Sequence, residues 1–124
     1  MEAASRSNYK LILTRIENWV GSGIPDLLMC DQLGAFHFVE LKYTTTNKVD
    51  LRPSQVAWLT RHRHSSSWVL VKKQPKPTEV AEIFLFRGAD AVDLKMEGLD
   101  KVRPEVRCKQ PFKWDKIFHL ISPM

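Results

Sequence analysis

Two acidic residues on neighbouring predicted strands, Asp26 and Glu40, are the side chains best placed to do chemistry. A hairpin centred on Leu33 sets Asp26 opposite Glu40. Cβ atoms of directly opposed residues lie about 4.5–5.5 Å apart, and like charges there are destabilising without a cation between them. Two carboxylates at that spacing can share Mg²⁺, which takes oxygen ligands at about 2.0–2.1 Å. The pair therefore predicts a metal site; the alternative is a surface acid that pairs with a lysine on a solvated sheet.

Two further charged residues extend this predicted row. Lys42 follows Glu40 by two positions and so projects from the same face of the strand, where an ammonium can hold an attacking water or stabilise charge on a phosphate. If a two-residue turn joins the two preceding strands, Glu17 falls opposite Asp26. Glu17 is then a third metal ligand, or else an exposed strand residue paired with Arg15 or Lys42. The geometry suits metal-assisted hydrolysis.

The elements that must position these residues follow from capping residues, turn residues and apolar patterning. The sequence predicts helices over 7–13, 53–64, 89–96 and 114–121, and strands over 15–20, 26–31, 35–43, 68–72 and 83–86. The order is a helix, a three-strand meander, a helix and two strands. This predicts an α/β fold, a mixed sheet flanked by helices, with a helix-linked crossover to the fourth strand.

The length of 124 residues fits one domain, 1–124, with a motif-bearing core over about 7–87 and a basic extension over about 88–124. The longest apolar runs are far shorter than the ~20 residues that cross a bilayer, so we expect no membrane span. The first ten residues lack an apolar signal region, which predicts a cytoplasmic, intracellular protein. Two cysteines outside any CxxC pattern exclude a disulfide scaffold and a zinc ribbon.

The positive charge is concentrated in two stretches. The formal net charge is +5, and residues 51–78 carry six lysines and arginines and no acid. Residues 101–116 carry six more against two acids. This distribution favours one positive face for a nucleic-acid partner; the alternative is an ordinary solvated surface.

The motif order supports a family resemblance. The run GSGIPD over 21–26, then Glu40-Leu41-Lys42, then Gln55 on the following helix, resembles the signature of the PD-(D/E)xK nucleases. Within that superfamily the chain is most similar to the compact VRR-Nuc branch, which includes stand-alone phage versions, and to the archaeal-type Holliday junction resolvases. The likeness covers about residues 7–71. It implies a restriction-endonuclease-like fold.

The resemblance also implies roles for individual residues. It implies Mg²⁺, with Mn²⁺ able to substitute, held by Asp26, Glu40 and the backbone carbonyl of Leu41. Lys42 would assist the water or the transition state. Gln55 would place DNA or tie its helix to the active strand; the alternative is a solvent-facing residue at a helix start.

Relatives also carry an acid on the opening helix, a role that Glu2 or Glu17 would fill here. The residues that we expect to contact DNA are Ser22, Gln55, Arg52, Arg61, Lys72 and Lys73.

These observations predict a metal-dependent endonuclease that cuts branched DNA, such as a Holliday junction. The resemblance to stand-alone phage versions implies a phage-encoded protein that acts in a host cytoplasm. The alternatives are a nuclease-fold DNA-binding module without cleavage activity and an interaction subunit of a repair or packaging complex. No phosphate-binding loop of the GxxxxGK[ST] type is present, so we expect no nucleotide cofactor.

The expected working form is a homodimer, because a junction offers two strands related by two-fold symmetry. Its contact would include Phe112, Trp114, Ile117, Phe118 and Leu120, unless that helix packs on its own sheet.

Overall fold

The computed structural model describes residues 10–16 and 23–123, and it is built on one six-stranded mixed sheet of order β1-β2-β3-β4-β5-β6. Its strands are β1 (Ile12–Arg15), β2 (Leu27–Cys30), β3 (Phe36–Thr44), β4 (Ser67–Lys73), β5 (Glu82–Arg87) and β6 (Val106–Lys109). All neighbours are antiparallel except β3 and β4, which are parallel. The predicted α/β class, the three-strand meander and the crossover to the fourth strand are confirmed.

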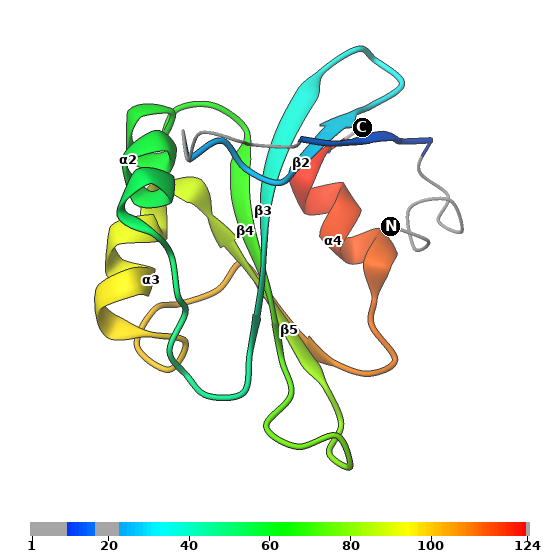
Figure 1. Ribbon diagram of the computed structural model, residues 1–124. Helices are drawn as coiled ribbons and strands as arrows, with labels where there is room; N and C mark the ends of the chain where they lie inside the picture. The colour runs from blue at the N-terminus through cyan, green and yellow to red at the C-terminus, as the bar shows by residue number, and fades with distance from the viewer. Residues whose placement is uncertain (1–9, 17–22, 124) are drawn as a thin grey trace.

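Helices cover both faces of this sheet. The helical elements are α2 (Pro53–Arg61), the 3-10 turn η1 (Gly88–Asp90), α3 (Ala91–Glu97) and α4 (Trp114–Ile121). Figure 1 shows α2 and α3 on one face and α4 on the other. Pro53 occupies the first turn of α2, where its fixed φ and missing N–H cost nothing. Among the described residues no helix is both long and apolar enough to cross a membrane.

Two hydrophobic clusters follow from the alternation of side chains along the strands. The first packs α4 on the sheet and contains Leu27, Met29, Val39, Trp68, Leu70, Ile83, Leu85, Val106, Ile117, Phe118 and Ile121. The second packs α2 and α3 on the other face and contains Val49, Leu51, Trp58, Leu59, Val69, Val71, Phe84, Phe86, Ala91, Leu94 and Leu99. The central strands β4 and β5 contribute to both clusters, so they are buried on both faces.

One predicted helix is wrong, one predicted strand is displaced and one strand was missed. The strand predicted over 15–20 shares only Arg15 with β1, and residues 17–20 lie outside the described residues. The helix predicted over 7–13 would include Ile12 and Leu13, which instead lie in β1 and pair with β2. Ile12 is exposed, whereas its neighbour Leu13 packs against the first cluster, so successive side chains point to opposite faces. That is the period of a strand, and the hydrogen bonds to β2 outweigh helix propensity. The sequence analysis also missed β6, whose four residues, two of them charged, give little apolar signal.

The segment predicted as a basic extension belongs to the fold. It forms α3, β6 and α4, and it supplies side chains to both clusters. Ile117 and Phe118 are fully buried against the sheet of their own chain, with Phe112, Trp114 and Leu120 packed beside them. The apolar side of α4 therefore packs on the sheet of its own chain, which is the alternative to a dimer contact.

Candidate metal and DNA-cleavage site

The register between β2 and β3 brings the two predicted acids together. Leu27 pairs with Val39 and Cys30 with Phe36, which is the predicted hairpin register. Continued by one position, it places Asp26 across from Glu40. The backbone N–H of Asp26 donates to Glu40 Oε1 at 3.2 Å, and the backbone N–H of Leu41 donates to Asp26 Oδ2 at 3.2 Å. Each carboxylate thus binds the backbone of the opposite strand.

Glu40 lies in a position where burial disfavours the charged form of its carboxyl group. Its residue is only 1% exposed, so the alternative of a solvated surface acid is wrong for Glu40. Burial, and then the charge of Asp26, raise the pKa of the Glu40 carboxyl to about 7. Lys42 Nζ lies 3.7 Å from Glu40 Oε2 and opposes this rise only in part. The pair of acids is one that a further cation would stabilise.

Gln55 connects this carboxylate to the start of α2. Its Nε2 donates to Glu40 Oε2 at 2.8 Å, and its Oε1 accepts from the backbone N–H of Arg52 at 2.9 Å. The side chain is buried, so the solvent-facing alternative is wrong. One amide therefore satisfies the first turn of α2 and fixes the orientation of Glu40.

Gly23 lies where the chain enters the site, in close contact with the same helix start. Its φ of +79° is in the left-handed region, and a Cβ built on it would lie 1.9 Å from the backbone oxygen of Ser54. A side chain larger than hydrogen does not fit there. The residue therefore allows the segment that leads to Asp26 to approach α2 closely.

The register predicted for the first two strands of the meander, which set Glu17 opposite Asp26, is not the register found. Arg15 pairs with Leu27, and the backbone N–H of Ile16 donates to the Asp26 carbonyl at 2.7 Å, so Ile16 neighbours Asp26. The predicted register is off by one residue, which in a strand exchanges the two faces. Glu17, like Ser22 and Glu2, lies outside the described residues. Within the described ranges, no three acidic, histidine or cysteine side chains form a group that could hold a metal.

The predicted DNA-contacting cations are divided between different surfaces. Arg52 is exposed at the N-cap of α2, beside Gln55. Lys73 shares the sheet face of Glu40, as the strand register shows, and donates to Asn47 Oδ1. Lys72 points to the opposite face, and Arg61 lies at the far end of α2, about 13 Å from its start. Only Arg52 and Lys73 are placed on the side of the carboxylate pair.

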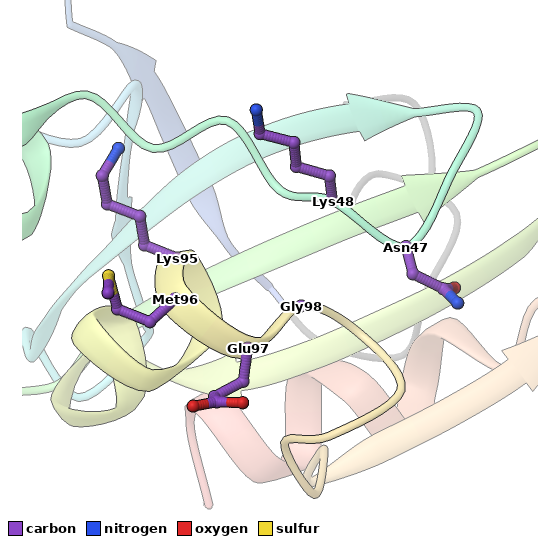
Figure 2. A pocket seen from close by; sticks show the side chains of 6 residues that line it. All are labelled: Asn47, Lys48, Lys95, Met96, Glu97 and Gly98. Atoms are coloured by element: carbon purple, nitrogen blue, oxygen red, sulfur yellow. The ribbon is translucent and has the colours of Figure 1, made fainter.

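A small cavity adds two cations that the sequence analysis did not single out. It has a volume of about 250 Å³ and is lined by Asn47, Lys48, Lys95, Met96, Glu97 and Gly98. Figure 2 shows Lys48 and Lys95 pointing to one side and Glu97 pointing away. Lys95 Nζ donates to the carbonyl of Leu51, next to the start of α2. The charges of the lining are mixed, and none of the lining residues belongs to the carboxylate pair.

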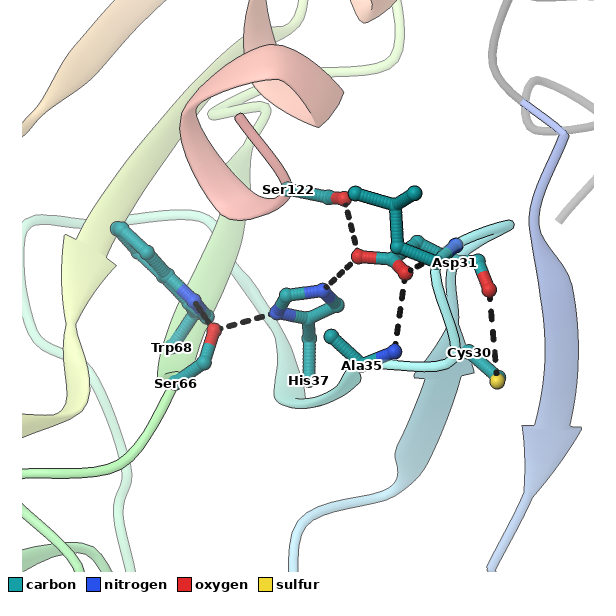
Figure 3. A network of polar contacts seen from close by, with 8 residues as sticks. Cys30, Asp31, Ala35, His37, Ser66, Trp68 and Ser122 are labelled. Atoms are coloured by element: carbon teal, nitrogen blue, oxygen red, sulfur yellow. Dashed lines mark hydrogen bonds and ion pairs between the residues drawn. The ribbon is translucent and has the colours of Figure 1, made fainter. Parts of the chain in front are cut away.

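A second polar network lies at the other end of the β2–β3 hairpin. Figure 3 shows the ring of His37 between Asp31 and Ser66: Nε2 donates to Asp31 Oδ2 at 2.9 Å, and Nδ1 is 2.6 Å from Ser66 Oγ. Ser122, at the end of α4, donates to Asp31 Oδ2 at 2.7 Å, and Trp68 Nε1 donates to Ser66 Oγ.

The hydrogen bonds from His37 and Ser122 hold the pKa of Asp31 well below its usual range. Asp31 Oδ1 also accepts from the backbone N–H groups of Leu33 and Ala35 in the hairpin turn. The network therefore connects the hairpin, β4 and α4. The residue in the sequence that could have indicated this network is Asp31, directly before the turn, because aspartate commonly accepts hydrogen bonds from turn N–H groups.

No model of a known protein family matches the chain, and no curated protein matches it. The site itself consists of two opposed carboxylates, one ammonium and one fixed amide.

Proposed function

We propose that the protein is a metal-dependent DNA endonuclease with a restriction-endonuclease-like core, similar to the VRR-Nuc branch of the PD-(D/E)xK nucleases. The observation that carries the proposal is the Asp26–Glu40 pair, with Lys42 and Gln55 at the second oxygen of Glu40. A sheet gains no stability from two opposed acids, one of them buried. Such a pair is explained by a cation that binds there.

Asp26, Glu40 and the backbone carbonyl of Leu41 would hold the metal. Their donors are all oxygens, the ligands that Mg²⁺ and Mn²⁺ prefer. The raised pKa of Glu40 is consistent with the fit, because burial and then the charge of Asp26 disfavour its ionised form, and Lys42 opposes them only in part. When bound, an ion of this class lowers the pKa of a water molecule and neutralises charge on a phosphate.

The chain's own residues have separate tasks in hydrolysis. The oxygen of a water forms a bond to phosphorus, and one phosphorus–oxygen bond to a sugar breaks. Lys42 is placed to hold that water or to stabilise the charge that grows on the phosphate. Gln55 keeps the Glu40 carboxylate in one orientation. Arg52 and Lys73 would bind backbone phosphates, which fixes the position of DNA without reading its bases.

The proposed substrate is branched DNA, with a Holliday junction first. Each chain provides one carboxylate pair, so paired cuts on a two-fold symmetric junction require two chains. The homodimer remains part of the proposal, with a contact other than the apolar side of α4.

The test is cleavage of labelled four-way junction, flap, nicked and linear DNA by the purified protein, with and without Mg²⁺ or Mn²⁺. The proposal expects metal-dependent cuts in branched DNA that Asp26→Asn and Glu40→Gln both abolish, whereas Glu97→Gln, a matched change beside the cavity on α3, cuts normally. DNA binding without cleavage at any metal concentration would instead identify a nuclease-fold binding module.

A further inference from the structure

An apolar surface lies beside the carboxylate pair on the same side of the sheet. We call it the open face and define it as Ile12, Leu28, Cys30 and Phe36. The register aligns Ile12, Cys30 and Phe36 in one row across β1, β2 and β3. Ile12 is 69% exposed and Phe36 is 60% exposed, and the other two residues are half-buried. In the described part of the chain, the cluster beneath α2 and α3 contains no residue of β1 or β2.

The open face is continuous with the carboxylate pair along β3. Glu40 and Phe38 both point toward α2, since Glu40 bonds to Gln55 and the Phe38 ring lies 5.2 Å from that of Trp58. Alternation places Phe36 on the same side, two residues further on. Phe36 and Glu40 are four positions apart on β3, a distance of about 13 Å along the strand. A few nucleotides span that distance, because stacked DNA rises about 3.4 Å per nucleotide.

Along α2, aromatic rings and then cations follow in the direction that leads away from Glu40 and toward Phe36. The helix runs opposite to β3, from Gln55 beside Glu40 to Trp58 beside Phe38. One turn later, the exposed ring of His62 stacks on Trp58 at 3.9 Å with an interplanar angle of 18°. Exposed positive or titratable side chains gather at this end of α2, namely Arg61, Arg63 and His64. Aromatic platforms next to cations are typical of sites for single-stranded nucleic acid.

We infer that the open face binds an unpaired DNA strand that leads to the carboxylate pair, with a base stacked on Phe36. The inference rests on the proposed function and deepens it: the substrate is unpaired next to the cut, as at a branch point or a flap. In a duplex the base faces are already stacked, so an exposed phenyl ring gains a partner only from a base that has left the stack. A DNA strand is favoured over a second copy of the chain, because the exposed cations at this end of α2 match the negative charge of a DNA backbone.

The test compares the binding of two labelled strands by fluorescence anisotropy, without divalent metal so that nothing is cut. One strand is a short oligothymidylate, and the other is an abasic strand of equal length and charge. Phe36→Ala should weaken oligothymidylate binding about 5- to 150-fold, the equivalent of ~1–3 kcal/mol for one stacked base. Abasic binding should not change, and Phe36→Trp should restore oligothymidylate affinity.

Tyr43→Ala is the matched control, because Tyr43 is also on β3, is 62% exposed and lies on the opposite face. An equal loss from Tyr43→Ala, an equal loss on the abasic strand, or no loss from Phe36→Ala would each overturn the inference. Light scattering provides a further check: if Phe36→Ala turns a dimer into a monomer and leaves DNA binding unchanged, the open face is an interface between copies. Phe36-dependent binding by a protein that never cuts DNA would refute the proposed function but not the open face.

Discussion

Replacing Gly23 by alanine tests whether the entry to the carboxylate pair depends on close contact with α2. The change has two costs. An L-residue at φ +79° costs ~1–2 kcal/mol, and a Cβ that would lie 1.9 Å from the Ser54 oxygen forces a shift of the backbone that costs a further ~1–3 kcal/mol. We expect Gly23→Ala to lower the free energy of unfolding by ~2–5 kcal/mol in total.

Gly34→Ala separates the two costs. Gly34 has nearly the same φ, +83°, but a Cβ there would meet no atom within 4 Å, so only the ~1–2 kcal/mol of strain applies. The effect of alanine on the unfolded chain is shared and cancels in the comparison. Urea unfolding measures both variants, and an excess of ~2 kcal/mol moves the midpoint by about 1 M. Equal midpoints for Gly23→Ala and Gly34→Ala would refute the close contact as the constraint.

Three further predictions concern separate parts of the molecule. Lys42→Ala should slow cleavage about 100-fold or more in single-turnover kinetics with a smaller loss of DNA affinity; weak binding with a normal rate at saturation would make Lys42 only an anchor. Phe118→Ala should cost ~3–5 kcal/mol in urea unfolding without changing the mass measured by light scattering, because this ring packs on its own sheet. Asp31→Asn should destabilise the protein near neutral pH, and less so as the pH falls below about 4. The pKa of Asp31 is lower in the folded protein than in the unfolded chain. The ionised carboxylate therefore stabilises the fold above the unfolded pKa, and this contribution is lost on protonation. A stability difference that stays constant from pH 7 to pH 3 would contradict this role of Asp31.

The carboxylate pair was predictable because its geometry is local. A hairpin with turn residues around Leu33 has few possible registers, and the β2–β3 register found is the one predicted from the sequence. The register between β1 and β2 was less predictable, since it depended on an assumed turn length, and the register found differs from the predicted one by one residue. The burial of Glu40 was not predictable either, because it arises from α2, which packs over β3 through Gln55.

Long-range contacts explain what the sequence analysis missed. β6 pairs with β5 across an intervening helix, and its polar residues do not identify it as a strand on their own. The bond between Asp31 and Ser122 joins residues 91 positions apart in the sequence. The apolar residues of α4 were correctly identified as one side of a helix, but pattern alone could not decide between a partner chain and the chain's own sheet.

Metal binding measured directly on the carboxylate pair is the most direct test of the central claim. Isothermal titration of Mg²⁺ and Mn²⁺ into the purified protein, without DNA, should show one divalent ion bound per chain. Asp26→Asn and Glu40→Gln should each abolish that binding while the fold, measured by circular dichroism, stays intact. Binding that is unchanged in both variants, or no binding of either ion to the wild-type protein, would contradict the claim that Asp26 and Glu40 form a metal site.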